Sequence, residues 1–177
     1  TAHWVARFPG AAGNMSLTVT GRVTANVLSP SGIRQIRNGD LVVIQRGGAA
    51  LIYTATRNNG AWVFGAADGS NLPAASLDPA VDRVLPLTLT VELLMPGMFA
   101  QPQLWDVLTV SDLQDRSRDS VTQVFAETIS NRMQALETPV VLETNAGLNL
   151  ARLASNLIDL DDWITNLVPA PTIPPTL

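Results

Sequence analysis

The stretch that decides the fold is NGDLVVIQRGGAALIYTATRNNGAWVF, residues 38–64. It contains three short runs rich in apolar and β-branched residues: Leu41–Gln45, Ala50–Thr56 and Ala61–Phe64. The runs are separated by Gly47-Gly48 and by Asn58-Asn59-Gly60. Gly-Gly and Asn-Gly supply the positive φ angles that tight hairpin turns require. The stretch therefore predicts a three-stranded antiparallel meander.

Strict alternation predicts two longer strands on either side of this meander. In the first, one face is apolar or small: Leu17, Val19, Gly21, Val23, Ala25 and Val27. This pattern indicates one long half-buried strand, or two strands bent at Gly21. In the second, the apolar face holds Leu87, Leu89, Val91, Leu93 and Met95.

Shorter strands are predicted at Leu104–Val110, at Val140–Leu142 and around His3-Trp4 at the start of the chain. Residues 66–86 are rich in Gly, Asn, Pro, Asp and Ser, so we expect a long loop there.

Two helices are predicted in the C-terminal part of the chain. Ser120 and Gln123 fit a capping box, and an apolar stripe then extends to Leu136 before Thr138-Pro139 ends the helix. A second helix is expected over residues 148–168. Its leucines and isoleucine have alternating spacings of three and four: Leu150, Leu153, Leu157, Leu160, Ile164 and Leu167. This is the a/d pattern of a coiled-coil seam, but an amphipathic helix packed on its own sheet has the same pattern, so both interpretations stay open.

The resulting fold class is α+β. An antiparallel β-rich body, sandwich-like or barrel-like, is expected over residues 1–110, followed by a helical segment over 111–168 that packs on the body or on a neighbour. Residues 169–177 contain Pro169, Pro171, Pro174 and Pro175, and this density of proline favours an extended polyproline II tail. We expect the tail to lie against its own domain or against a neighbouring subunit.

The composition excludes most familiar active sites. The chain has no lysine and no cysteine, and its single histidine is His3. Schiff-base lysines, thiolate nucleophiles, phosphate-binding P-loop lysines and cysteine zinc sites are therefore excluded. The net charge is −4 with no basic tract, which argues against nucleic acid as a partner. No apolar stretch reaches 18 residues, so no membrane span is predicted. Thr1-Ala2-His3-Trp4 does not have the pattern of a signal peptide, and the absence of cysteine fits a protein inside or outside the cell.

The clusters of oxygen-bearing side chains in the sequence do not fit catalytic or metal sites. Asp78 with Asp82, and the Asp159, Asp161 and Asp162 group, fit a solvated surface better than a glycosidase pair. Asp68-Gly69-Ser70-Asn71 does not match a calcium loop. We therefore predict no catalytic residue, no cofactor and no metal site.

Only 15% of the residues are charged, and a surface with so little charge is often covered by neighbouring subunits. The alternative is a small domain rich in Thr, Ser and Asn. The candidate interface residues are two arginines before the first helix, three residues of the second helix and the tail prolines: Arg116, Arg118, Leu150, Leu157, Ile164, Pro169, Pro171, Pro174 and Pro175.

The GD-apolar run at 39–44, followed by Asn59-Gly60-Ala61-Trp62-Val63-Phe64, resembles the β-meander modules of tailed-bacteriophage tail-associated proteins. This resemblance covers residues 38–64. It implies a structural protein of the virion, in the tail, baseplate or fibre attachment, whose partners are copies of itself and other virion proteins. It also implies that no residue is catalytic. The alternatives are a capsid decoration or cement protein, and a β domain that binds a carbohydrate or another ligand.

Overall fold

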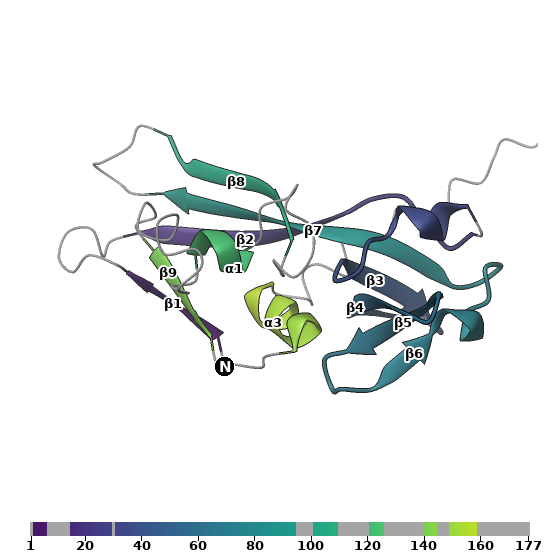
Figure 1. Ribbon diagram of the computed structural model, residues 1–177. Coiled ribbons are helices and arrows are strands. Elements are labelled where there is room, and N and C mark those ends of the chain that lie inside the picture. Colours follow the sequence, from purple (N-terminus) through teal and green to yellow (C-terminus); the bar gives the residue numbers. More distant parts are fainter. Residues whose placement is uncertain are drawn as a thin grey trace, which may run out of the picture.

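The computed structural model describes residues 2–6, 15–29, 31–94, 101–109, 121–125, 140–144 and 149–158. It is mostly antiparallel β-sheet (Figure 1). The strands are β1 (Ala2–Ala6), β2 (Ser16–Val23), β3 (Leu41–Arg46), β4 (Ala49–Asn58), β5 (Ala61–Ala66), β6 (Asn71–Pro73), β7 (Arg83–Leu94), β8 (Gln103–Leu108) and β9 (Val140–Thr144). The helical elements are η2 (Gly32–Gln35), η3 (Ala74–Ser76), α1 (Val121–Phe125) and α3 (Leu150–Leu157).

The predicted meander is confirmed as β3, β4 and β5. β3 pairs with β4 through Gly47-Gly48, and β4 pairs with β5 through Asn59-Gly60, both antiparallel. All four turn residues have positive φ, from 48° at Asn59 to 85° at Gly60. Two successive positive φ angles match the twist of the flanking strands, which is why these dipeptides fix the register of both hairpins.

Gly60 offers a direct test of this turn chemistry. A Cβ at Gly60 would meet no atom within 4 Å, so the cost of a side chain there comes from its φ of +85° alone. We expect Gly60→Ala to lower the free energy of unfolding by about 1–2 kcal/mol. The matched control is Gly65→Ala, where φ is not positive and the nearest atom would be Asn71 Oδ1 at 3.6 Å. Urea unfolding of both variants checks this, and equal stability of the two would contradict it.

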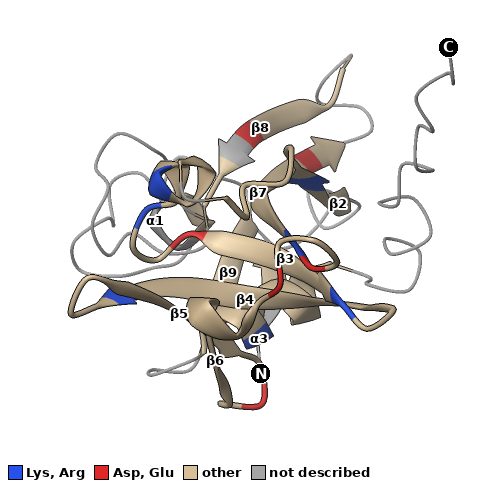
Figure 2. Cartoon of the chain, turned by 90° about the vertical axis from the view of Figure 1, so that its right-hand side faces the viewer, with Lys and Arg blue, Asp and Glu red and all other residues tan. Residues whose placement is uncertain are grey.

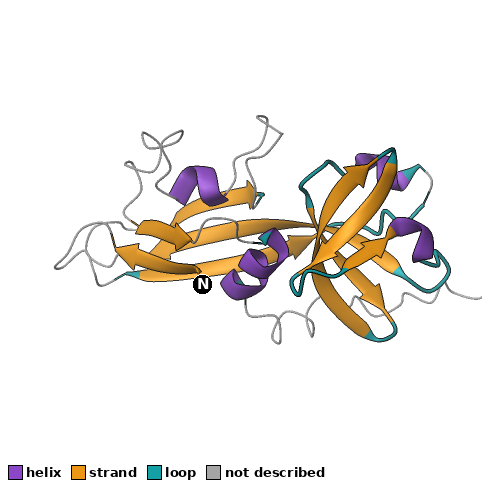
Figure 3. Ribbon diagram, turned by 60° about the horizontal axis from the view of Figure 1, so that its bottom comes forward, coloured by secondary structure: helices purple, strands orange, loops and turns teal. Residues whose placement is uncertain are grey.

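The 12-residue strand β7 holds the larger sheet together. Its first half pairs with β3, from Arg83 opposite Gln45 to Leu87 opposite Leu41. Its second half pairs with β2 on one edge and with β8 on the other. The seven strands therefore follow the order β2-β7-β3-β4-β5-β6, with β8 beside the far half of β7. Figure 3 shows that the strands in one half of the molecule run along its length, whereas those in the other half are steeply inclined to them.

Two predicted boundaries are wrong where β2 meets β7. β2 ends at Val23 instead of continuing to Val27, and it pairs with β7 as one strand without interruption at Gly21. Beyond Val23, a side chain takes the place of a backbone acceptor, because the Asn26 carboxamide oxygen accepts the Val84 N–H at 2.9 Å. The Val27 N–H donates to the Val84 carbonyl at 2.8 Å.

β7 begins at Arg83 although Pro86 favoured a loop. The Pro86 carbonyl accepts the Thr24 N–H, so its missing donor faces this irregular edge and no bond to β3 is lost. The predicted loop over 66–86 also contains β6 and η3, which pack beside β5.

One face of β7 and β3 packs into a large core, the first core. It contains Leu87, Leu89, Val91 and Leu93 of β7, together with side chains of β9, α1 and α3. β1 and β9 form a separate two-stranded sheet, with Ala2 opposite Thr144 and Ala6 opposite Val140. In Figure 1, β1, β9, α1 and α3 lie on one side of β2, β7 and β8.

A second core lies on the opposite face of β3. It contains Val42, Ile44, Phe64 and Val84, all nearly inaccessible to solvent. The uninterrupted apolar run Leu41–Ile44 is explained by this arrangement, because β3 is buried on both faces.

The second predicted helix is shorter than expected. α3 starts at its N-cap Asn149, whose side chain accepts the Arg152 N–H at 3.0 Å and donates to the Ala66 carbonyl at 2.8 Å. It ends at Leu157, because Ile158 has an extended backbone (φ −111°, ψ 134°) that places its side chain in the first core. A continuous helix over 148–168 is therefore wrong. Of the helix predicted from Ser120, α1 covers Val121–Phe125, and the remainder lies outside the described residues.

Candidate functional site

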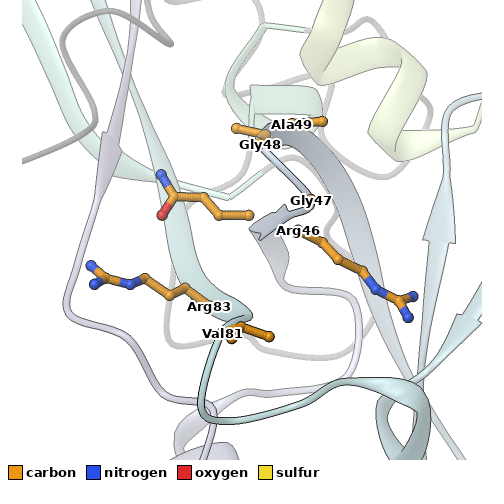
Figure 4. A pocket seen from close by; sticks show the side chains of 8 residues that line it. Arg46, Gly47, Gly48, Ala49, Val81 and Arg83 are labelled. Carbon is orange, nitrogen blue, oxygen red and sulfur yellow. The ribbon is translucent and has the colours of Figure 1, made fainter.

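Two adjoining hollows open at the end of the larger sheet, and they share Gln45 and Arg83. The first, about 230 Å³, lies around the Gly47-Gly48 hairpin and Val81 (Figure 4). The second, about 310 Å³, lies between β7 and the segment 23–26. Gln45 and Arg83 face each other across β3 and β7, so the strand register itself places them between the two hollows.

Arg46 and Arg83 differ in how they are paired. The Arg46 Nε lies 3.6 Å from Asp82 Oδ2, and its Nη2 donates to the Ser76 carbonyl at 3.3 Å. Arg83 makes no ion pair or side-chain hydrogen bond with any other residue in the described part of the chain. Figure 4 shows the two guanidinium groups extending to opposite sides of the first hollow.

The Asp78–Asp82 pair has a structural role. Asp82 is only 4% exposed, and its Oδ2 accepts the Asp78 N–H at 2.9 Å as well as the contact from Arg46. The Asp82 N–H in turn donates to the Asp78 carbonyl at 2.8 Å. These bonds close the turn that leads into β7, and the two carboxylates do not face each other across a cleft.

Asp68 likewise closes a turn, between β5 and β6. Its Oδ1 accepts the Ser70 hydroxyl at 2.6 Å and the Ser70 N–H at 2.8 Å, while Gly69 has a φ of +89°. The hydroxyl bond first, and then the backbone bond, hold the pKa of the Asp68 carboxyl below its ordinary value. Among the described residues, no group of three or more His, Cys, Asp or Glu side chains is arranged to hold a metal ion.

A second candidate site is the face of β2, β7 and β8 that points away from the first core, which we term the outer face. Leu104 of β8 lies opposite Glu92 of β7, and Leu94 follows two residues later on the same face. Leu104 is 57% exposed and Leu94 is 38% exposed. The two leucines are diagonal neighbours across the strand pair, so together they form one apolar patch.

Polar groups surround this patch on the same face. Asp106 accepts the Thr90 hydroxyl at 2.6 Å, and its other oxygen lies 3.9 Å from Arg22 Nη1 on β2. Charged residues are otherwise sparse and scattered over the molecule, as Figure 2 shows. The outer face therefore presents an apolar patch with a weakly charged border.

The predicted interface residues are placed only in part. Leu150 and Leu157 of α3 are half-buried and pack on the first core of their own chain. All of the others lie outside the described residues: Arg116, Arg118, Ile164, Pro169, Pro171, Pro174 and Pro175. The same holds for Asp159, Asp161 and Asp162. His3 lies on β1, where its backbone pairs opposite Glu143.

The tryptophans that the structure describes serve as packing anchors. The rings of Trp4 and Trp105 each meet Phe125 edge-on at 5.1 Å between centroids. Trp62 lies under the Arg57 guanidinium at 5.9 Å. Sequence reasoning missed Arg83, Gln45, Leu94 and Leu104 as site residues. For Leu94 and Leu104 the alternation of their strands gave a signal, because it places both side chains on the face opposite the buried residues. Nothing in the sequence placed Gln45 opposite Arg83.

Comparison of the chain with protein families, with curated proteins and with solved structures finds no match. No helix among the described residues is long and apolar enough to cross a membrane.

Proposed function

We propose that this chain is a structural component of a tailed-phage particle, in its tail, baseplate or fibre attachment, and that it works by packing against other subunits. The exposed leucine patch of the outer face carries the proposal. Its support from the sequence is the resemblance of residues 38–64 to tail-associated β-meander modules, and those residues form β3, β4 and β5.

The outer face has the composition of an association surface. Fully burying a leucine side chain that was exposed contributes about 1.5–3 kcal/mol, and Leu104 keeps 57% of its surface in solvent. We propose that a second copy of the chain covers the outer face. In a two-fold interface each residue is buried twice, so the gain from Leu94 and Leu104 doubles.

Charge on the same face is self-complementary, which supports a second copy. Arg22 on β2 lies 3.9 Å from Asp106 of its own chain, at the outer limit of an ion pair. Glu92 lies on β7, on the same face as Leu94 and Thr90. Glu92 has no ion-pair partner among the described residues. A two-fold related copy can bring its arginine to this carboxylate at the rim, where such pairs select the partner more than they add affinity.

The finer architecture belongs to the same proposal. In this proposal the Pro-rich tail 169–177 contacts neighbouring subunits in the particle, whereas α1 and α3 of the helical segment 111–168 pack on the body of their own chain. The body is a sandwich or barrel of antiparallel strands. Two alternative functions differ in the self-association that they predict. A capsid decoration or cement protein would also assemble. A β domain that binds a carbohydrate or another ligand would stay monomeric.

Leu104→Ser tests the proposal, with Leu51→Ser as its matched control. Leu51 on β4 is 51% exposed, close to the 57% of Leu104, but it lies away from the outer face. We expect Leu104→Ser to weaken self-association about tenfold or more, since about 1.4 kcal/mol corresponds to a factor of ten. Sedimentation velocity over a concentration series measures this.

Leu51→Ser should leave self-association unchanged. A wild-type chain that stays monomeric at all concentrations, or equal losses in the two variants, would contradict packing through the outer face.

A further inference from the structure

We propose that the hollow between Asn26 and Arg83 binds a carboxylate group that carries a short aliphatic chain. The site lies at the end of the larger sheet, and it is independent of the outer face. Its lining combines an arginine, two carboxamides and a hydroxyl with an apolar floor: Arg83, Gln45, Asn26, Thr24, Leu85 and Val23.

Arg83 supplies the charge for such a ligand. It is exposed, and none of the described residues offers its guanidinium an ion pair or a hydrogen bond. The neighbouring Arg46 is already committed to Asp82 and to the Ser76 carbonyl. The planar guanidinium fork matches the two oxygens of a carboxylate, which it binds through two parallel hydrogen bonds.

Asn26 supplies a donor whose identity is fixed by its partners. Its Oδ1 lies 3.0 Å from the Leu28 nitrogen and 2.9 Å from the Val84 nitrogen. Both partners are N–H donors, so the atom that they contact must be the carbonyl oxygen, and the Asn26 NH₂ group is the other end of the carboxamide. That NH₂ group donates to no acceptor in the described part of the chain.

The charge balance selects a singly charged anion. Arg46 and Asp82 compensate each other at 3.6 Å, which leaves Arg83 as the one uncompensated cation among the described residues that line the hollow. A dianion such as phosphate would keep one negative charge that Arg83 does not compensate. The volume of about 310 Å³ also exceeds that of a bare carboxylate, and Leu85, Val23 and Ala25 offer apolar contact to an aliphatic chain.

The carboxylate has two chemical sources, a free short-chain acid and the C-terminal carboxylate of a protein. Butyrate is the probe for the first and N-acetyl-leucine is the probe for the second. Tighter binding of butyrate assigns the free acid, and tighter binding of N-acetyl-leucine assigns the protein terminus. Either result supports the shared chemistry.

The experiment is an NMR titration of the whole chain at neutral pH, which follows the amide signals of the segment 23–26 and of β7. A ligand of this size is expected to bind with a dissociation constant on the order of 1–10 mM. Arg83→Gln should weaken binding by about tenfold or more. Asn26→Asp keeps the acceptor for Leu28 and Val84, removes the NH₂ donor and adds a like charge, so it should abolish binding.

Arg34→Gln is the matched control, because Arg34 is exposed on η2 and does not line either hollow. It should leave the dissociation constant unchanged. The proposal is overturned if the wild type shows no shifts with either probe, if Arg83→Gln or Asn26→Asp binds butyrate as the wild type does while remaining folded, or if inorganic phosphate binds more tightly than both probes.

Discussion

Replacing Phe125 by alanine is expected to lower the free energy of unfolding by about 3–5 kcal/mol, near the upper limit for a single truncation. Phe125 is completely buried, and its ring meets Trp4 of β1 and Trp105 of β8 edge-on. Each such aromatic pair adds about 0.5–1.5 kcal/mol beyond the buried area. One side chain on α1 therefore joins the two-stranded sheet to the larger one.

Thermal and urea unfolding measure this effect. Val124→Ala is the neighbouring control, since Val124 is only partly buried against the first core, and we expect it to cost less. Phe125→Leu keeps most of the apolar volume and should recover part of the loss. A Phe125→Ala protein as stable as Val124→Ala would show that the three aromatic rings do not hold α1 against the sheets.

Leu153→Ala is expected to cost about 2–5 kcal/mol, and Leu157→Ala distinctly less. Leu153 is 1% exposed in the first core, whereas Leu157 is half-buried at its edge. The a/d spacing alone would rank the two leucines equally, so the difference depends on how α3 lies on β4.

The same pair of variants decides what α3 packs on. Because the buried face of α3 lies on β4, with further contacts to β1 and β5, the loss in Leu153→Ala should not depend on protein concentration. The opposite result would be a melting temperature that rises with protein concentration in the wild type but not in Leu153→Ala. It would place this leucine between subunits, since association stabilises by mass action.

The parts of the fold that sequence predicted were those fixed by local chemistry. Gly47-Gly48 and Asn59-Gly60 specify their hairpins because few other residues accept two successive positive φ angles. The alternation of apolar and polar residues predicted the buried face of β7, because successive side chains on a strand point to opposite sides.

Long-range partners decided what local patterns could not. The end of β2 depends on the Asn26 carboxamide meeting Val84, 58 residues away in the sequence. The end of α3 depends on Ile158 entering the first core. The hollow beside Arg83 depends on strand order, which brings residues 23–26, 45 and 83 together. None of these contacts has a signature in a short window of sequence.

The most direct test of subunit packing through the outer face is the accessibility of leucine methyl groups to a soluble paramagnetic agent, measured by NMR in dilute and in concentrated protein. We predict that the methyl groups of Leu94 and Leu104 become protected as the concentration rises. Those of Leu51, 51% exposed on β4, should stay accessible throughout. Leu94 and Leu104 methyl groups that remain as accessible as those of Leu51 in protein that has self-associated would place the interface elsewhere and contradict the proposal.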